Sequence, residues 1–125
     1  MVTASKGTPV GRRGDIWTVD LEPVRGAEAN KRRPAVIVSN QAATSAAFER
    51  GHGVVTVVPV TSRTDRVLSF QTYLPAARTG LEVDSKAQAE QVRSVDVRRL
   101  VALVGVVPRD LLDDVDDALR LHLAL

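Results

Sequence analysis

The sequence predicts a small α+β domain, and three observations lead to this fold class. The chain has 125 residues, which suits one domain with a single hydrophobic core. Short apolar or alternating runs, separated by glycine, proline and polar turns, are typical of β-strands. Two further segments carry the capping residues and the periodicity of helices. Because short connections favour antiparallel neighbours, we expect a strongly curved antiparallel sheet or small barrel, which protects its edges.

Several runs have the composition of strands. Residues 15–21 alternate, with Trp17, Val19 and Leu21 on one face, as in a half-buried strand. The run at 53–60 is the richest in β-branched residues, which favours a core strand. The expected strands cover residues 15–21, 34–39, 53–60, 69–75, 81–84, 87–95 and 100–107.

Two helices are expected, one after the second strand and one at the C-terminus. Asn40 can cap a helix over 41–50, and Gly51 stands where a left-handed residue ends many helices. The second helix covers 108–125, and Pro108 suits its first turn. Apolar residues recur along it at helical spacing, so one face should pack on the sheet.

The chain is predicted to form one domain over residues 13–125, preceded by a loose lead-in at 1–12. The lead-in lacks the apolar core of a secretion signal. No apolar run approaches the ~20 residues that span a bilayer. We therefore expect a cytoplasmic protein that does not contact a membrane. The absence of cysteine excludes disulfides and thiolate zinc sites.

Charge is unevenly distributed, although the net charge is only +2. Residues 1–33 hold seven basic and four acidic side chains, whereas residues 109–125 hold two basic and five acidic ones. A basic body with an acidic C-terminal segment can bind a polyanion on one side. A normally mixed surface is consistent with the same numbers, so charge alone leaves both interpretations open.

Several familiar kinds of active site have little support in the sequence. His52 and His122 fall on different predicted elements, so a histidine acid–base pair is poorly supported. The carboxylates within 113–117 point to several sides of a helix and lack a calcium-type loop. No phosphate-binding loop or dinucleotide-binding glycine motif occurs. We therefore expect neither a metal ion nor a cofactor.

Two polar features remain as candidates. Arg25 precedes a glycine in a basic segment, where its planar guanidinium could face an anion. Thr61 and Ser62 stand at the end of a predicted core strand, which would hold two hydroxyls rigidly. The alternatives are a flexible charged loop and a strand-end cap. Together, an arginine and a hydroxyl could serve a reaction whose nucleophile belongs to the substrate, such as the 2′-OH of RNA.

Three blocks cover nearly everything after residue 12: RGDIWTVDLEPVRGAEANKRRPAVIVSN, VVPVTS and TGLEVDSKAQAEQVRSVDVRRLVALVGVVP. In their order and spacing these blocks resemble the MazF/PemK (Kid-type) toxins of bacterial type II toxin–antitoxin systems. The resemblance implies an SH3-like curved antiparallel β-barrel with a short helix after the second strand and a C-terminal helix. It also implies assembly as a homodimer.

The resemblance further implies an activity and a partner. The activity is that of an mRNA interferase, a metal-independent and sequence-specific endoribonuclease on single-stranded RNA. It would leave 2′,3′-cyclic phosphate and 5′-OH ends and inhibit translation and growth. The partner is a cognate antitoxin, whose acidic C-terminal segment would cover the groove that binds RNA.

Matching positions imply the site residues. The basic residue of the family's P-x-R/K-G-x-E loop falls on Arg25, and the threonine of its P-x-T-S block falls on Thr61. These two would be the catalytic pair, with Arg25 stabilising charge at the phosphate and Thr61 aiding proton transfer or positioning. The expected substrate-binding residues are Glu28 in the loop, Ser62 beside Thr61, Gln91 in the D-Q-x-R/K block, and the RNA-steering bases Lys31 and Arg33.

Two other functions remain open on the sequence. Gyrase-poisoning toxins share the barrel and bind a protein–DNA complex without cutting RNA, and fold alone does not separate the two. In such poisons the end of the last helix carries the contact, often with a tryptophan, whereas this chain ends in LRLHLAL. The second alternative is a non-catalytic RNA-binding barrel, although the chain has few aromatic rings for base stacking.

Overall fold

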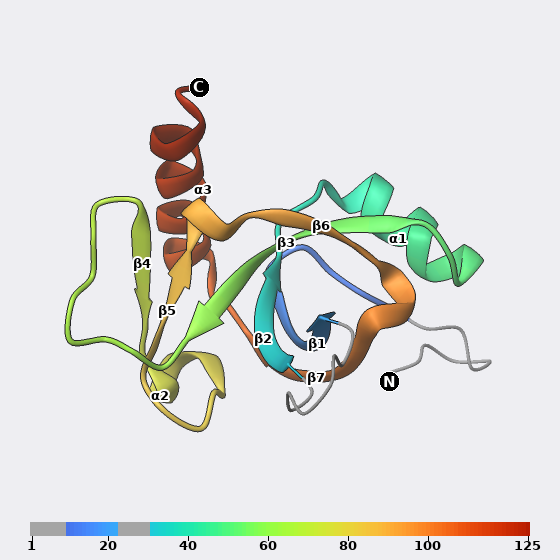
Figure 1. Ribbon diagram of the computed structural model, residues 1–125. Coiled ribbons are helices and arrows are strands. Elements are labelled where there is room, and N and C mark those ends of the chain that lie inside the picture. Colours follow the sequence, from blue (N-terminus) through green and yellow to red (C-terminus); the bar gives the residue numbers. More distant parts are fainter. Residues whose placement is uncertain (1–9, 23–30) are drawn as a thin grey trace.

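The computed structural model describes residues 10–22 and 31–125, and Figure 1 shows the order of the elements along the chain. The expected lead-in at 1–12 lies outside the described residues except for its last three. The elements are β1 (Asp15–Glu22), β2 (Lys31–Ile37), α1 (Gln41–Arg50), β3 (Val54–Thr61), β4 (Gln71–Leu74), α2 (Ala76–Thr79), β5 (Ser85–Gln88), η2 (Ala89–Gln91), β6 (Arg93–Asp96), η3 (Val97–Arg99), β7 (Leu100–Val106) and α3 (Arg109–Leu123).

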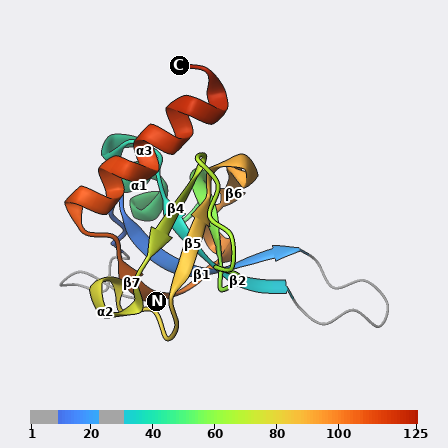
Figure 2. The ribbon, with the colours of Figure 1, turned by 90° about the vertical axis from the view of Figure 1, so that its left-hand side faces the viewer.

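The described strands form one antiparallel sheet of seven strands, in the order β4-β5-β3-β2-β1-β7, with β6 also paired to β3. β3 has two successive partners, because residues 54–57 pair with β6 and residues 60–61 pair with β5. The sheet is strongly curved (Figures 1 and 2). Its path does not close within the described residues. The expected α+β class is therefore confirmed, with an open curved sheet.

Two apolar clusters lie on opposite faces of the central strands. Because side chains alternate along β1, Trp17 enters one cluster and Ile16 enters the other. Trp17 packs on Phe48 of α1, with ring centroids 5.4 Å apart. Val115 of α3 is buried in the second cluster. The two long helices thus cover different faces of the curved sheet.

Both predicted helices are confirmed, together with the signals that predicted them. The Asn40 side chain accepts a hydrogen bond from the Ala43 N–H at 2.8 Å, which caps α1. Gly51 has a φ of 70° and its N–H returns to the Ala47 carbonyl, so the left-handed end is also present. In α3, Asp110 stands in the first turn, where the helix dipole favours a carboxylate.

Two of the strand predictions are wrong. Residues 81–84 form an irregular link between α2 and β5. Gly80, at a φ of 87°, turns the chain, and Asp84 accepts a hydrogen bond from the Ala76 N–H at 2.9 Å. The expected strand 87–95 is divided by η2, because β5 and β6 pair with different halves of β3. The alternation of apolar and polar residues along a sequence does not show where a chain changes from one pairing region of a neighbouring strand to another.

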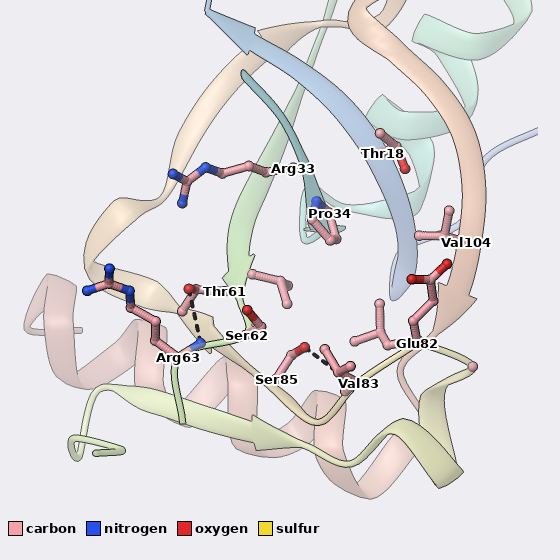
Figure 3. A pocket seen from close by; sticks show the side chains of 13 residues that line it. Thr18, Arg33, Pro34, Thr61, Ser62, Arg63, Glu82, Val83, Ser85 and Val104 are labelled. Carbon is pink, nitrogen blue, oxygen red and sulfur yellow. Dashed lines mark hydrogen bonds between the residues drawn. The ribbon is translucent and has the colours of Figure 1, made fainter. Parts of the chain in front are cut away.

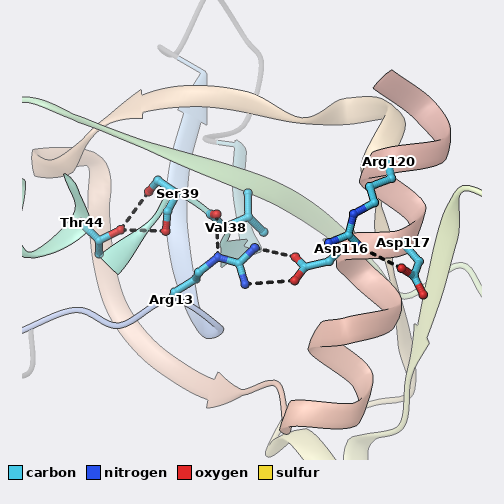
Figure 4. A network of polar contacts seen from close by, with 7 residues as sticks. All are labelled: Arg13, Val38, Ser39, Thr44, Asp116, Asp117 and Arg120. Atoms are coloured by element: carbon cyan, nitrogen blue, oxygen red, sulfur yellow. Dashed lines mark hydrogen bonds and ion pairs between the residues drawn. The ribbon is translucent and has the colours of Figure 1, made fainter. Parts of the chain in front are cut away.

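Arg13 ties α3 to the end of β2 (Figure 4). Its guanidinium contacts both carboxylate oxygens of Asp116, at 2.5 Å and 3.3 Å. The Nε atom of Arg13 donates a further hydrogen bond to the Val38 carbonyl at 2.9 Å. This side chain thus adds polar contacts between α3 and the sheet to the apolar packing of the helix. Within the described ranges, none of the helices is long and apolar enough to cross a membrane.

Candidate functional site

A cavity of about 670 Å³ opens where β2 begins and β3 ends (Figure 3). The strands β1 and β7 contribute to its wall, and the link between α2 and β5 contributes the rest. Its floor and walls are partly apolar, with Pro34, Val60 and Val104 among the lining residues. The polar side chains around it are Thr18, Arg33, Thr61, Ser62, Arg63, Glu82 and Ser85.

Thr61 is the last residue of β3 and lines this cavity. The four residues before it, 57–60, are all buried, so the backbone that carries Thr61 is fixed by the core. Its side chain is half-buried, and its Oγ1 accepts a hydrogen bond from the Arg63 N–H at 3.3 Å (Figure 3). No acceptor for the hydroxyl hydrogen of Thr61 is found in the part of the chain that the structure describes, so this hydrogen can be donated to a ligand.

Two arginines give the cavity its positive charge. Arg33 extends from β2 and Arg63 from the segment after β3, and both side chains are exposed at the rim (Figure 3). Among the described residues, neither guanidinium forms an ion pair. Glu82 brings one exposed carboxylate to the same cavity. Unpaired guanidinium groups beside a hydroxyl can bind an anionic oxygen through charge-assisted hydrogen bonds.

The wall made by the link between α2 and β5 is held by its own hydrogen bonds. Ser85 Oγ donates to the Val83 carbonyl at 2.9 Å, and Asp84 accepts from the Ala76 N–H. That backbone hydrogen bond, with a second one from the Tyr73 hydroxyl, lowers the pKa of the Asp84 carboxyl below its usual value. The carboxylate form of Asp84 thus supports this wall at neutral pH.

The structure brings together three of the seven residues that the sequence predicted for the site. Thr61, Ser62 and Arg33 line one cavity, although they come from two strands and the segment after β3. Gln91 lies exposed at the end of η2 and does not line that cavity. The remaining three cannot be placed around it. The backbone of Lys31 starts β2, where it pairs with Glu22, but its side chain is not among those that the structure describes. Arg25 and Glu28 lie outside the described residues altogether.

The sequence reasoning missed several residues around the cavity. Arg63 follows the predicted hydroxyl pair directly, so its charge was a visible signal. Thr18 is visible only as a polar position on the alternating strand β1. Glu82 and Ser85 carry no usable signal, because the sequence predicts a strand followed by a turn for the segment that holds them. Their place depends on the irregular link that the structure shows.

Within residues 10–22 and 31–125, histidine, aspartate and glutamate side chains form no cluster of three or more that could hold a metal ion.

The fold and the site together define a class of protein. It is a small domain with a curved antiparallel sheet that places a threonine hydroxyl and two guanidinium groups around one cavity. The model of one family, "PemK-like, MazF-like toxin of type II toxin-antitoxin system", matches residues 12–123. The chain belongs to this family.

Two relatives and one solved structure illustrate the likeness. Endoribonuclease MazF9 of Mycobacterium tuberculosis is 55% identical over 114 residues, covering 91% of this chain and 97% of the relative. Endoribonuclease EndoA of Bacillus subtilis is 31% identical over 115 residues, covering 91% and 95%. The crystal structure of MazE-MazF from Deinococcus radiodurans superposes with a TM-score of 0.73 at 29% identity, covering 94% of this chain and 98% of that one.

Proposed function

We propose that the protein is the toxin of a type II toxin–antitoxin system and acts as an endoribonuclease on single-stranded RNA. It cuts without a metal ion, leaves 2′,3′-cyclic phosphate and 5′-OH ends, and thereby inhibits translation and growth. The observation that carries the proposal is that the Thr61 hydroxyl and the side chains of Arg33 and Arg63 line one cavity. Membership of the MazF-like family and the two relatives named endoribonucleases support it.

The proposed reaction uses a nucleophile that RNA itself supplies. The 2′-oxygen of one ribose attacks the adjacent phosphorus, and the bond between phosphorus and the 5′-oxygen breaks. One proton leaves the attacking oxygen and one reaches the departing oxygen, so the atoms balance and no water is consumed. Negative charge grows on the phosphate oxygens in the transition state, where fixed guanidinium groups stabilise it.

We assign the catalytic roles to Arg25 and Thr61. Arg25 is assigned from its place in the family motif. A guanidinium has a pKa above ~12 and is a poor base, so Arg25 acts by stabilising phosphate charge. Thr61, with its oxygen accepting from the Arg63 N–H, has its proton free for the phosphate or the departing oxygen. The substrate contacts are assigned to Glu28, Ser62, Gln91, Lys31 and Arg33.

We further propose that a cognate antitoxin inhibits the protein through an acidic segment that competes with RNA for the arginine-bearing cavity. The MazE-MazF crystal structure from Deinococcus radiodurans supports a partner of this kind. Because such binding joins opposite charges at an exposed surface, it should weaken as salt rises. The active form is proposed to be a homodimer in the cytoplasm.

A digest of single-stranded RNA by the purified protein in excess EDTA tests the proposal. We expect fragments that carry a cyclic phosphate at one new end and a 5′-OH, open to kinase labelling, at the other. Cleavage that requires a divalent metal, or that leaves 3′-OH ends, would rule the mechanism out. A gyrase supercoiling assay run beside the digest should show no inhibition, whereas inhibition without RNA cleavage would favour the gyrase-poisoning alternative.

A further inference from the structure

A buried lysine lies directly beside Thr61. Lys86 is on β5, where it pairs with Thr61 of β3 on one side and with Tyr73 of β4 on the other. Paired residues of an antiparallel sheet project from the same face, so the three side chains form one row. Lys86 stands in the middle of this row and is only 8% exposed.

The Lys86 side chain is largely buried, and among the described residues no carboxylate pairs with its ammonium group. Its Nζ donates a hydrogen bond of 2.5 Å to the Arg66 carbonyl, which is its one polar contact among the described residues. Removing an ammonium from water is costly unless other groups replace the lost hydration. One carbonyl replaces only part of it, because an ammonium has three donors. Among the described residues, the group that Lys86 holds is a backbone carbonyl of the segment after β3.

The contact that Lys86 makes lies in the segment that follows Thr61. Residues 62–70 join β3 to β4 without regular structure of their own. Ser62 and Arg63 of this segment line the cavity, and the Arg63 N–H donates to Thr61 Oγ1 (Figure 3). By holding Arg66, Lys86 thus fixes the part of the chain that shapes one side of the cavity.

A second buried side chain holds the far end of the same segment. Gln71, which is 9% exposed, accepts a hydrogen bond from the Leu68 N–H at 3.0 Å through its Oε1. Its Nε2 donates to Glu90 Oε2 at 2.7 Å. The Gln71 N–H also returns to the Leu68 carbonyl at 2.9 Å. The segment is therefore tied at two points, by Lys86 near its middle and by Gln71 at its end.

We propose that Lys86 is a positioning residue that fixes the 62–70 segment over β5 and so determines which RNA sequences the cavity accepts. The proposal rests on the proposed ribonuclease function for its second half. Bases entering the cavity must fit against Ser62 and Arg63, and a segment that shifts would accept a wider range of bases. Specificity depends on such rigid placement, since selection is a difference between two binding energies.

The test replaces Lys86 by methionine, which keeps an unbranched side chain and removes the ammonium group. In the RNA-free protein, we expect exchange within residues 64–68 to become on the order of tenfold faster at the Leu68 amide, which Gln71 protects. The reason is that losing the hydrogen bond from a charged group to the Arg66 carbonyl loosens the segment. With a pool of random RNA, we expect the preference for the best-cut sequence over the others to fall, on the order of tenfold.

Two further variants make the result interpretable. Arg50→Met removes one positive charge from the end of α1, which does not line the cavity, and should leave both amide exchange and cut-site preference unchanged. Gln71→Leu removes the second tie and should also speed exchange within 64–68. It gives an independent readout should Lys86→Met fail to fold, a failure that circular dichroism would reveal.

Amide exchange and RNA cutting are separate readouts, so the two proposals can fail separately. A wild-type protein that cuts no RNA would remove the ribonuclease and the role of Lys86 in specificity. Unchanged exchange within 64–68 in a folded Lys86→Met protein would refute the positioning role of Lys86. If that variant does not fold, unchanged exchange in Gln71→Leu would refute it. A Lys86→Met protein that cuts every RNA sequence more slowly by the same factor would refute the role in specificity, because that pattern indicates loss of rate without loss of selection.

Discussion

At the scale of single residues, the central feature is a threonine hydroxyl held by a buried strand. Thr61 ends β3, and the N–H two residues later occupies one lone pair of its oxygen. Among residues 10–22 and 31–125, no histidine or carboxylate is hydrogen-bonded to this hydroxyl, so its proton is available to a bound group. Such an arrangement suits a group that donates to a phosphate oxygen or to a departing oxygen.

Thr61→Ala should lower kcat for RNA cleavage on the order of 10²-fold while leaving the fold intact, because it removes one positioned donor. Thr61→Ser keeps the hydroxyl and should retain most of the activity. Thr56→Ala is a matched control, since Thr56 lies on the same strand but does not line the cavity. Single-turnover cleavage of a short RNA measures all three. Full activity in Thr61→Ala would remove this residue from the catalytic pair.

Asp15, at the start of β1, gives a pH dependence with a defined sign. Burial raises the pKa of its carboxyl, despite a hydrogen bond from the Arg12 N–H at 2.8 Å. A raised pKa in the folded state stabilises the protein below the unfolded pKa of ~3.9, and this stabilisation is lost as pH rises through the folded pKa. The free energy of unfolding of the wild type, minus that of Asp15→Asn, should therefore increase as pH falls toward 4.

Asp96 provides the control of opposite sign. A hydrogen bond from the Arg98 side chain, with one from the Arg98 N–H, lowers the pKa of the Asp96 carboxyl. Its stabilisation is present above the unfolded pKa and is lost as pH falls through the folded one. Urea unfolding of Asp96→Asn across the same pH range should thus show the reverse trend. Parallel curves for the two variants would contradict this assignment.

At the scale of elements, α3 is attached to the sheet by two arginines of different burial. Arg13 reaches Asp116 from the turn before β1, and Arg78 of α2 reaches Asp110 through two hydrogen bonds of 2.7 Å and 2.8 Å. The Arg13 pair is the more buried, with side chains 29% and 23% exposed against 46% and 64% for the other. Ion pairs at exposed positions contribute little to stability.

Arg13→Met should therefore lower the free energy of unfolding by about 1–2 kcal/mol, since it also removes the hydrogen bond to the Val38 carbonyl. Arg78→Met should have a clearly smaller effect, although the geometry of its pair is equally good. Chemical denaturation at moderate salt compares the two. An equal or larger loss in Arg78→Met would show that burial does not rank these contacts.

The elements also show how far sequence alone reaches. The helix at 41–50 was predictable because Asn40 and Gly51 encode its ends locally. Residues 81–84 were not, because Asp84 bonds to the Ala76 N–H, a contact between segments that no periodicity reports. The two hydroxyls at the end of β3 followed from a local pattern as well. That these hydroxyls and Arg33 line the same cavity depends on the curvature of the sheet. Local sequence patterns do not determine this curvature.

At the scale of the whole molecule, the curved sheet keeps the acidic helix α3 apart from the arginine-bearing cavity. The second apolar cluster and α3 lie together, and none of the described residues that line the cavity belongs to α3. The acidic helix is thus built into the fold through its apolar face, while the arginines of the cavity come from β2 and from the segment after β3. The acidic side chains of α3 therefore do not line the cavity, and the arginines at its rim keep that rim positive.

The nature of the nucleophile tests the account most directly, since every assigned role assumes that RNA attacks its own phosphate. The measurement is cleavage of a short RNA with a single 2′-deoxy nucleotide immediately before the cut bond, compared with the all-ribose RNA. We expect the all-ribose RNA to be cut at that bond and the substituted one to remain intact there, because the attacking oxygen is missing. Cleavage of the 2′-deoxy bond at a comparable rate would contradict the account, because water or a protein group would then be the nucleophile.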